Sequence, residues 1–373
     1  MKIAVATARF LVGGLFIFSG LVKAIDPLGL TYKMEEFFEV WGRTSYLSGF
    51  MSFLTEYAFA FSVIMITLEV ALGVALLIGW NRKLTLRLLL LLILFFTFLT
   101  SYVLFTGKIR ACGCFGDCIP LTPIQTFTKD IILLLLILFL LRKRKDIEPL
   151  FKSPIPFSAV LVSVIATALL QMHVVEHLPA VDCLPFKKGN NILELRKMPA
   201  DAIPDKFEYS FIYEKNGEKK EFAVSALPDS TWKYVDRKQT LVQAGKNNVP
   251  LINDFSLTAA DGGDSTETIL NKENYYLFFI KNMQEAIVDR WQSTFRDVVK
   301  KAKDNKIPIY VITSDTKNAN TFFNQVNSYN LPIYTTDGTA IKTAARAVPT
   351  MFVMKGPVVQ AKYSWADLDE LLK

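Results

Sequence analysis

Five long apolar runs in the first half of the chain constrain its fold more than any other feature of the sequence. A helix needs about 20 mostly apolar residues to cross the hydrocarbon core of a bilayer. Runs that meet this requirement cover residues 3–24, 57–80, 84–105, 131–141 with an extension back to 123, and 157–175. The fourth is the weakest, because Lys129 and Asp130 interrupt its first half and must lie at the interface or face the bundle interior. We therefore predict an integral membrane protein that has the lipid bilayer as its first partner.

Basic residues beside two of the spans predict how the helices are oriented. Three lie between positions 82 and 87, after the second span, and four occupy positions 142–145, after the fourth. Positive charge accumulates in the cytoplasmic segments of membrane proteins. We therefore expect the N-terminus in the cytoplasm, and the loops 26–56 and 106–128 and everything after residue 177 on the opposite side. Much of the formal net charge of +7 lies in these two clusters, so no nucleic-acid partner is expected.

The chain has four cysteines, and this orientation places all of them outside the cytoplasm. Cys112, Cys114 and Cys118 lie in the loop 106–128, and Cys183 follows the fifth span. Cysteines confined to an oxidising compartment favour disulfides. Three thiols within seven residues cannot all staple their own loop, so at least one of them pairs elsewhere or stays free.

Three interpretations of these cysteines remain open. The first is two structural disulfides, for instance one within the loop and one from the loop to Cys183. The second is a redox-active pair that exchanges with a partner, because the nearby Lys108 and Arg110 favour the thiolate that carries out exchange. The third is a metal site that adds His173 and His177, which share a helix face at this spacing. Two histidines four residues apart are a weak metal signal on their own, and we predict no metal.

Two ionisable residues interrupt the apolar spans away from their ends. Counted from the cytoplasmic ends of their helices, Arg9 and Glu69 differ in depth by roughly 6 Å at about 1.5 Å per residue, which is within reach of an arginine side chain. An unpaired charge at such a depth costs several kcal/mol. We therefore predict that Arg9 and Glu69 form an intramembrane polar pair. The alternatives are a proton-handling or quinone-contacting Glu69, and a Glu69 that is simply protonated.

Several motifs in the first 142 residues resemble one family of membrane proteins. They are Arg9, the run Gly-Leu-Phe-Ile-Phe-Ser-Gly-Leu-Val-Lys-Ala-Ile-Asp-Pro at positions 14–27, the pattern Glu69-x₃-Gly73-x₅-Gly79, and Cys-Gly-Cys-Phe-Gly at positions 112–116. Together they resemble the DoxX/MauE family, and the last motif is closest to the MauE branch, which is linked to methylamine utilisation. The resemblance implies a four-helix bundle in a bacterial inner membrane, with a role in disulfide or quinone-linked redox chemistry outside the cytoplasm. Cys118 lies beyond the motif, so the resemblance assigns it no role.

The second half of the chain reads as a soluble region. Residues 207–224 alternate in polarity around Asn216-Gly217, which is a strong hairpin signal. From position 250 onward strands alternate with helices, beginning with a strand at 251–257, and this indicates an α/β sheet. The order resembles the thioredoxin fold in its TlpA/peroxiredoxin-like branch, and Ala347-Val348-Pro349-Thr350 matches the cis-proline loop of that fold.

This thioredoxin-like region departs from the redox members of its fold in one respect. At the position of their Cys-x-x-Cys motif the chain has residues 281–287, and no cysteine follows Cys183. Thiol–disulfide exchange needs a thiolate, so the region cannot perform exchange unaided. We predict that it is a binding module for a partner or substrate, or a structural cap.

The expected fold class is a membrane all-α bundle followed by a soluble α/β thioredoxin-like domain. Its four predicted parts are a four-helix DoxX/MauE-like membrane domain at 1–145, a basic linker with the fifth transmembrane helix at 146–177, a small β-rich connecting segment at 178–248, and a thioredoxin-like extracytoplasmic domain at 249–373. The expected location is the bacterial inner membrane, with the C-terminal domain on the periplasmic side.

Two functional hypotheses follow from these features. The favoured one is a membrane thiol/disulfide redox protein that takes electrons from an extracytoplasmic protein partner through the candidate catalytic residues Cys112, Cys114, Cys118 and Cys183, with quinone as the candidate acceptor. The competing one is a non-enzymatic membrane scaffold with structural disulfides, in which the soluble domain docks a partner protein.

Overall fold

The computed structural model describes residues 2–43, 46–109, 113, 115–151, 154–243, 245, 247–284 and 286–373. Within these residues, five helices are long and apolar enough to cross a membrane. They are α1 (Lys2–Ala24), α4 (Ala58–Ile78), α5 (Arg82–Thr106), α6 (Pro123–Arg142) and α7 (Ile155–His177). Each covers a span predicted from the sequence, so the prediction of a multi-pass membrane protein is confirmed.

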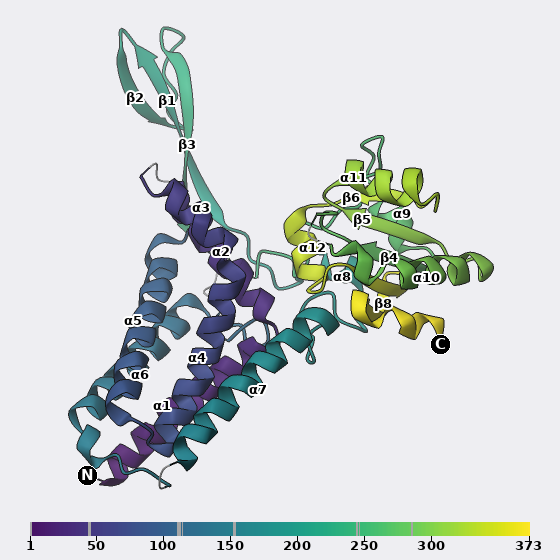
Figure 1. The fold of residues 1–373 in the computed structure, drawn as a ribbon. Coiled ribbons are helices and arrows are strands. Elements are labelled where there is room, and N and C mark those ends of the chain that lie inside the picture. The colour runs from purple at the N-terminus through teal and green to yellow at the C-terminus, as the bar shows by residue number, and fades with distance from the viewer. Residues whose placement is uncertain are drawn as a thin grey trace.

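The spanning helices pack against each other in pairs (Figure 1). Helix α1 packs along α4, α5 along α6, and α7 along α4. Helices α1 and α4 come closest where two glycines face each other. A Cβ atom on Gly13 would lie 3.1 Å from the Gly73 carbonyl oxygen, and one on Gly73 would lie 2.8 Å from that of Gly13. Small residues permit such close helix contacts in membranes, and this contact sets how far α1 is shifted along α4.

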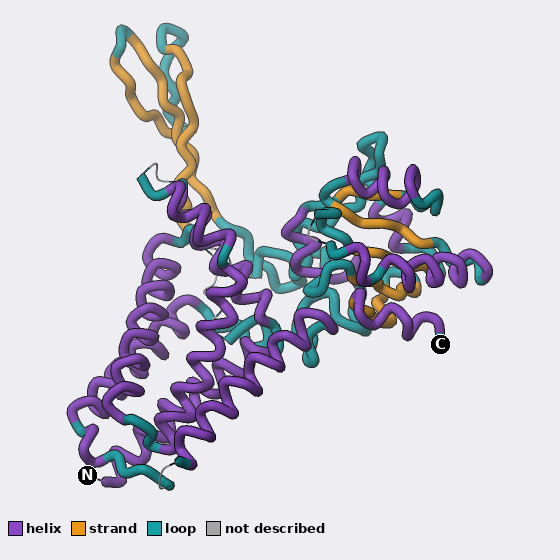
Figure 2. Tube along the Cα trace, viewed as in Figure 1, coloured by secondary structure: helices purple, strands orange, loops and turns teal. Residues whose placement is uncertain are grey.

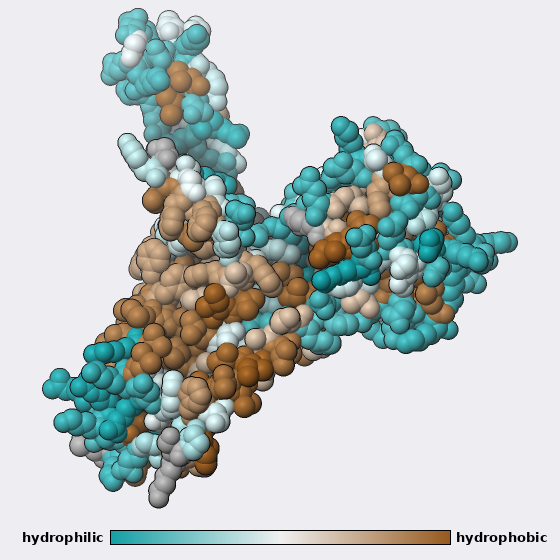
Figure 3. Space-filling model, in the orientation of Figure 1, coloured by the Kyte–Doolittle hydropathy of each residue, from teal (hydrophilic) through white to brown (hydrophobic). Residues whose placement is uncertain are grey.

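The two ends of the bundle differ in composition. The N-terminus, the start of α5 and the end of α6 lie at one end, which we call the basic end (Figure 1). The opposite end, which we call the cysteine end, carries α2 (Pro27–Gly42), α3 (Ser48–Glu56), the cysteine loop (residues 107–122) and the region after α7 (Figure 2). A hydrophobic surface covers the bundle between these hydrophilic regions (Figure 3).

A three-stranded sheet extends away from the bundle on its own (Figure 1). It is formed by β1 (Lys206–Lys215), β2 (Glu218–Ala223) and β3 (Lys233–Gln243), in the order β2-β1-β3. The predicted hairpin is confirmed, since Lys215 pairs with Glu218 across Asn216 and Gly217, both with positive φ. Strand β3 was not predicted. Rings from all three strands contact one another on one face of the sheet, among them Phe211, Tyr213, Phe222 and Tyr234.

The remaining region is an α/β domain, as predicted. Its sheet has the order β6-β5-β4-β7-β8, with β4 parallel to β5 and antiparallel to β7. The strands are β4 (Asn274–Phe279), β5 (Ile309–Thr313), β6 (Ile333–Thr335), β7 (Thr350–Lys355) and β8 (Val358–Ser364), and the helices include α10 (Gln292–Asp304) and α12 (Gly338–Ala344). The Val348–Pro349 peptide bond is cis. This arrangement is compatible with the thioredoxin-like fold.

One predicted strand of this domain is absent from the described structure. Residues 251–257 form no strand, and the segment joins the sheet only through an isolated bridge between Thr258 and Thr335. The reason lies in its hydrogen bonding, because the Leu257 N–H donates to the Thr266 hydroxyl at 2.8 Å instead of to a neighbouring strand. Its apolar side chains are nevertheless buried in the core, among them Ile252, Phe255 and Leu257.

Candidate functional site

A disulfide connects the cysteine loop to the segment that follows α7. It joins Cys118 to Cys183, whose Cα atoms lie 4.9 Å apart. Cys112 and Cys114, the other two candidate residues, lie outside the described residues. The structure therefore brings together two of the four candidate cysteines, in the loop-to-Cys183 connection that was one of the sequence-based options.

The described part of the cysteine loop forms a turn that anchors it in the bundle. The Gly116 N–H donates to the Gly113 carbonyl at 3.0 Å, and both glycines have positive φ. Between them the buried ring of Phe115 packs 5.8 Å from the Phe18 ring of α1 and lies 5.0 Å from the Lys129 Nζ of α6. The sequence motif thus seats an aromatic side chain between two spanning helices, directly after Cys114.

Glu69 is paired inside the bundle, but not with the predicted partner. Its carboxylate forms an ion pair with Lys23 and accepts a hydrogen bond from the Ser19 hydroxyl at 2.9 Å. The Lys23 and Glu69 side chains are 2% and 1% exposed, so the pair is fully removed from solvent and lipid. The predicted contact between Arg9 and Glu69 is wrong.

Arg9 instead caps the end of α4. Its guanidinium donates to the carbonyl oxygens of Leu76 at 2.8 Å and Leu77 at 2.6 Å. These are carbonyls of the last helical turn, where backbone partners run out, although the Leu76 carbonyl also accepts from the capping Gly79 N–H at 3.2 Å. The prediction counted each depth from the end of its own helix, but α1 extends beyond α4 at the basic end. Arg9 therefore lies level with the end of α4, and Glu69 lies about two turns deeper at about 1.5 Å per residue.

A second ion pair, between a partly buried Lys129 and a fully buried Asp130, lies close to the first. Lys129 Nζ is 2.7 Å from Asp130 Oδ1, and the Thr100 hydroxyl of α5 donates to Asp130 Oδ2 at 3.1 Å. Both ion pairs line a small cavity of about 20 Å³, together with Ser19, Phe96 and Phe115. Lys129 and Asp130 were noticed in the sequence because they interrupt the apolar run of the fourth span. Lys23 was missed, because it lies near a helix end, where a lysine usually reaches the interface.

The α/β domain is held against the cysteine end by Arg346, which precedes the cis-proline. Its guanidinium donates to Asp26 Oδ2 at 2.9 Å and to Asp117 Oδ2 in the cysteine loop at 2.7 Å. The arginine side chain is only 6% exposed. Burial alone would lower the pKa of Arg346, but the Asp26 and Asp117 carboxylates outweigh burial and raise it. The guanidinium therefore stays charged and binds the soluble domain, the start of α2 and the cysteine loop together.

Further ion pairs surround this contact. Lys342 pairs with Glu35 of α2 at 2.6 Å, and Lys362 pairs with Asp182 at 2.8 Å, beside Cys183. His177 Nδ1 lies 2.7 Å from Asp367 Oδ1, and the His173 ring stacks on that of His177. The two histidine rings therefore contact each other, and His177 takes part in docking the soluble domain.

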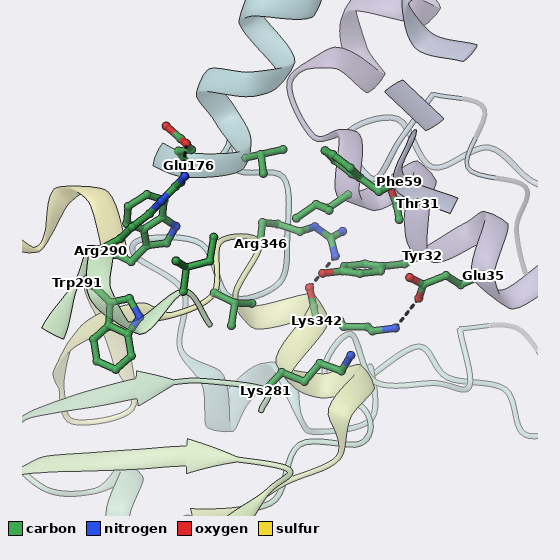
Figure 4. Close-up of a pocket in the computed structure, with 15 residues that line it drawn as sticks. Thr31, Tyr32, Glu35, Phe59, Glu176, Lys281, Arg290, Trp291, Lys342 and Arg346 are labelled. Carbon is green, nitrogen blue, oxygen red and sulfur yellow. Dashed lines mark hydrogen bonds and ion pairs between the residues drawn. The ribbon is translucent and has the colours of Figure 1, made fainter. Parts of the chain in front are cut away.

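A cavity of about 370 Å³ lies between the α/β domain and the bundle (Figure 4). Lys281, the second residue after β4, lines it and begins the segment that was predicted to replace the Cys-x-x-Cys motif. The Glu35–Lys342 pair lies on one side and the Glu176–Arg290 pair on another (Figure 4). The lining also includes Trp291, which is 1% exposed and whose indole N–H has no hydrogen-bond acceptor among the described residues.

Fold and site together define a multi-pass membrane protein that carries a cysteine loop and an α/β domain at the same end of its bundle. The bundle is similar to the family described as methylamine utilisation protein MauE, which matches residues 1–143. This match confirms the resemblance to the MauE branch. A domain of unknown function (DUF8463) matches residues 207–244, which include most of the protruding sheet.

One similar protein is named TlpB and comes from Flavobacterium psychrophilum. It is 38% identical to the chain over 146 residues, which make up 38% of this chain and 38% of TlpB. The chain thus spans well under half the length of this relative.

Proposed function

We propose that this protein is a thiol/disulfide redox protein of a bacterial inner membrane, with its cysteine end on the periplasmic side. The supporting observation is the position of Phe115, which places the cysteine loop beside Lys129 and beside the cavity that both intramembrane ion pairs line. A purely structural loop has no need of four intramembrane charges, each of which is costly to bury. Such charges are expected where a membrane protein handles protons or electrons.

The proposed reaction has two steps that balance in atoms and electrons. First, a reduced periplasmic protein partner exchanges with a disulfide between Cys112 and Cys114, which leaves the partner oxidised and the loop as a dithiol. The dithiol then reduces a lipid-soluble quinone, so that two electrons and two protons pass from sulfur to the quinone oxygens. Cys118 and Cys183 form the separate bond that holds the loop to the soluble domain. The cavity beside the charges holds about one water molecule and not a quinone ring, so the quinone position is left unassigned.

The α/β domain acts in this proposal as a binding module. It has no cysteine, and the face that would carry one points toward the cysteine end of the bundle. The interdomain cavity has the size of a small-molecule or side-chain pocket.

A non-enzymatic scaffold is the second candidate function. The observation that favours it is the Cys118–Cys183 bond, which links the bundle to the soluble region as a structural disulfide would. In this case the remaining two cysteines also form a staple.

Cys114→Ser separates the two functions. In a redox protein it removes the sulfur that resolves an exchange intermediate, so we expect a mixed disulfide with a partner, or complete loss of thiol oxidation in isolated membranes. Non-reducing gels and mass spectrometry of native membranes measure both. The double variant Cys118→Ser/Cys183→Ser is the control, and we expect it to cost about 2–4 kcal/mol of stability while exchange continues. If all four single serine variants keep full function and lose only thermal stability, the scaffold is correct.

The periplasmic placement is tested by labelling. A membrane-impermeant thiol reagent applied to intact spheroplasts after mild reduction should modify Cys112, Cys114, Cys118 and Cys183, because the two basic clusters lie at the opposite end of the bundle. Labelling that requires lysis would contradict the orientation. A cysteine introduced at Lys83, at the basic end, is the control and should react only after lysis.

A further inference from the structure

The Cys118–Cys183 disulfide links the bundle to the α/β domain covalently, in addition to the chain itself. Cys118 lies in the cysteine loop, which belongs to the bundle. Cys183 is attached to the α/β domain, because the residues that follow it pack there. The Phe186 side chain is 2% exposed in the core of that domain, and the Gly189 N–H donates to the Val359 carbonyl of β8 at 2.8 Å. The bond therefore fixes the cysteine loop directly to the docked domain.

An aspartate stands immediately before each cysteine of this bond and pairs with a cation of the α/β domain. Asp117 Oδ2 accepts a hydrogen bond from the Arg346 guanidinium at 2.7 Å, and Asp182 Oδ2 accepts one from Lys362 Nζ at 2.8 Å. The Arg346 and Lys362 side chains are each 6% exposed, whereas that of Asp117 is 48% exposed. Since Asp117 adjoins the bonded cysteine, the disulfide keeps this carboxylate within reach of the buried arginine.

The disulfide itself is open to attack. Cys118 and Cys183 are both partly exposed. Exposed disulfides are reduced more readily than buried ones, and they are the bonds that serve labile or regulatory roles. Once this bond is broken, the loop keeps the Asp117–Arg346 pair at this point, and an ion pair with a half-exposed partner contributes little and is screened by salt. The disulfide is thus the part of the docking contact that salt does not weaken.

We infer that the Cys118–Cys183 bond is a redox-sensitive latch, which a dithiol protein opens to loosen the α/β domain and expose the walls of the interdomain cavity. The sulfur–sulfur bond breaks as two electrons and two protons pass from the dithiol to the two cysteines, so the dithiol becomes a disulfide. The cavity has walls on both sides of the contact, with Tyr32 on α2 and Lys281 on the α/β domain (Figure 4). This inference goes beyond the exchange reaction proposed above and does not depend on it.

The first test asks whether the bond can be reduced in the folded protein. Full-length protein in lipid nanodiscs is treated with dithiothreitol, its free thiols are alkylated, and the peptides that contain Cys118 and Cys183 are quantified by mass spectrometry. We expect both cysteines to be alkylated without denaturant, because both are partly exposed. Alkylation that requires denaturant shows a closed structural staple and overturns the inference.

The second test measures docking by energy transfer in single molecules. Glu39 of α2 and Lys300 of α10 are exposed, so p-acetylphenylalanine at both positions can carry a dye pair without the use of a thiol. With the bond closed, we expect one population from low salt to about 1 M potassium chloride. After reduction, we expect an undocked population that grows about 10-fold over this range, because the remaining ion pairs are screened when the Debye length falls to about 3 Å.

Two double variants are the controls for this test. Cys118→Ser/Cys183→Ser lacks the latch, so it should behave like the reduced protein with and without dithiothreitol. Cys112→Ser/Cys114→Ser lacks the proposed exchange pair and keeps the latch, so it should respond to dithiothreitol as the wild type does. The same salt response in oxidised protein, reduced protein and both variants overturns the inference. A normal latch in a protein whose membranes oxidise no thiol contradicts the proposed function instead.

Discussion

Glu69→Ala is expected to lower the free energy of unfolding of the bundle by about 3–5 kcal/mol, because it leaves the Lys23 ammonium buried without a counter-charge. The reciprocal change Lys23→Ala should cost a similar amount. Replacing both with apolar residues of similar volume, as in Lys23→Met/Glu69→Leu, should recover most of the loss, because such a pair often replaces a buried ion pair without penalty. Reversible unfolding in detergent micelles measures all three variants.

A second double-mutant cycle, between Arg9 and Glu69, tests whether Lys23 and not Arg9 is the partner of Glu69. Arg9 bonds to the end of α4 and not to Glu69, so the losses in Arg9→Ala and Glu69→Ala should add to within about 0.5 kcal/mol in the double variant. A strong coupling between Arg9 and Glu69, or a loss in Glu69→Ala no larger than for a surface charge, would contradict the pairing described here.

Arg346→Ala should release the α/β domain from the bundle. The change removes the shared cation from Asp26, which is 17% exposed, and from Asp117, which is 48% exposed, and we expect docking to weaken by about 2–3 kcal/mol. Distances between spin labels on α2 and on α10 should then broaden from one population to many. The Cys118–Cys183 bond still fixes the segment after α7 to the cysteine loop, so the released domain stays close to the bundle.

Arg290→Ala is the matched control for this experiment. Arg290 pairs with Glu176 of α7 at 3.2 Å, but the two side chains are 51% and 47% exposed. An exposed pair contributes about 0–1 kcal/mol, so this variant should keep the narrow distance distribution. Equal effects of the two variants would mean that the buried position of Arg346 is unimportant for docking.

The spans, their alternating direction and the hairpin were predictable because each depends on residues close together in the sequence. Apolar length sets a span, basic flanks suggest its direction, and Asn216-Gly217 sets a turn. The tight turn of the cysteine loop is equally local, since Gly113 and Gly116, which form it, belong to the same short motif.

The partners of the intramembrane charges were not predictable in this way. They depend on the shift between α1 and α4, which the contact between Gly13 and Gly73 sets and which counting from helix ends does not reveal. Arg346 gave no signal either, because its two carboxylate partners lie 320 and 229 residues away in the sequence. In the sequence, an arginine three residues before a proline gives the same pattern whether its side chain is buried at an interface or exposed.

The length of the protruding sheet sets a minimum size for any partner that contacts both this sheet and the cysteine loop. Strand β3 has 11 residues, and at about 3.3 Å per residue it reaches roughly 36 Å along its axis. The sheet thus projects well beyond the end of the bundle that carries α2 and α3 (Figure 1). A partner that touches both the tip of this sheet and the loop must be several nanometres long, the size of a folded protein domain rather than of a metabolite.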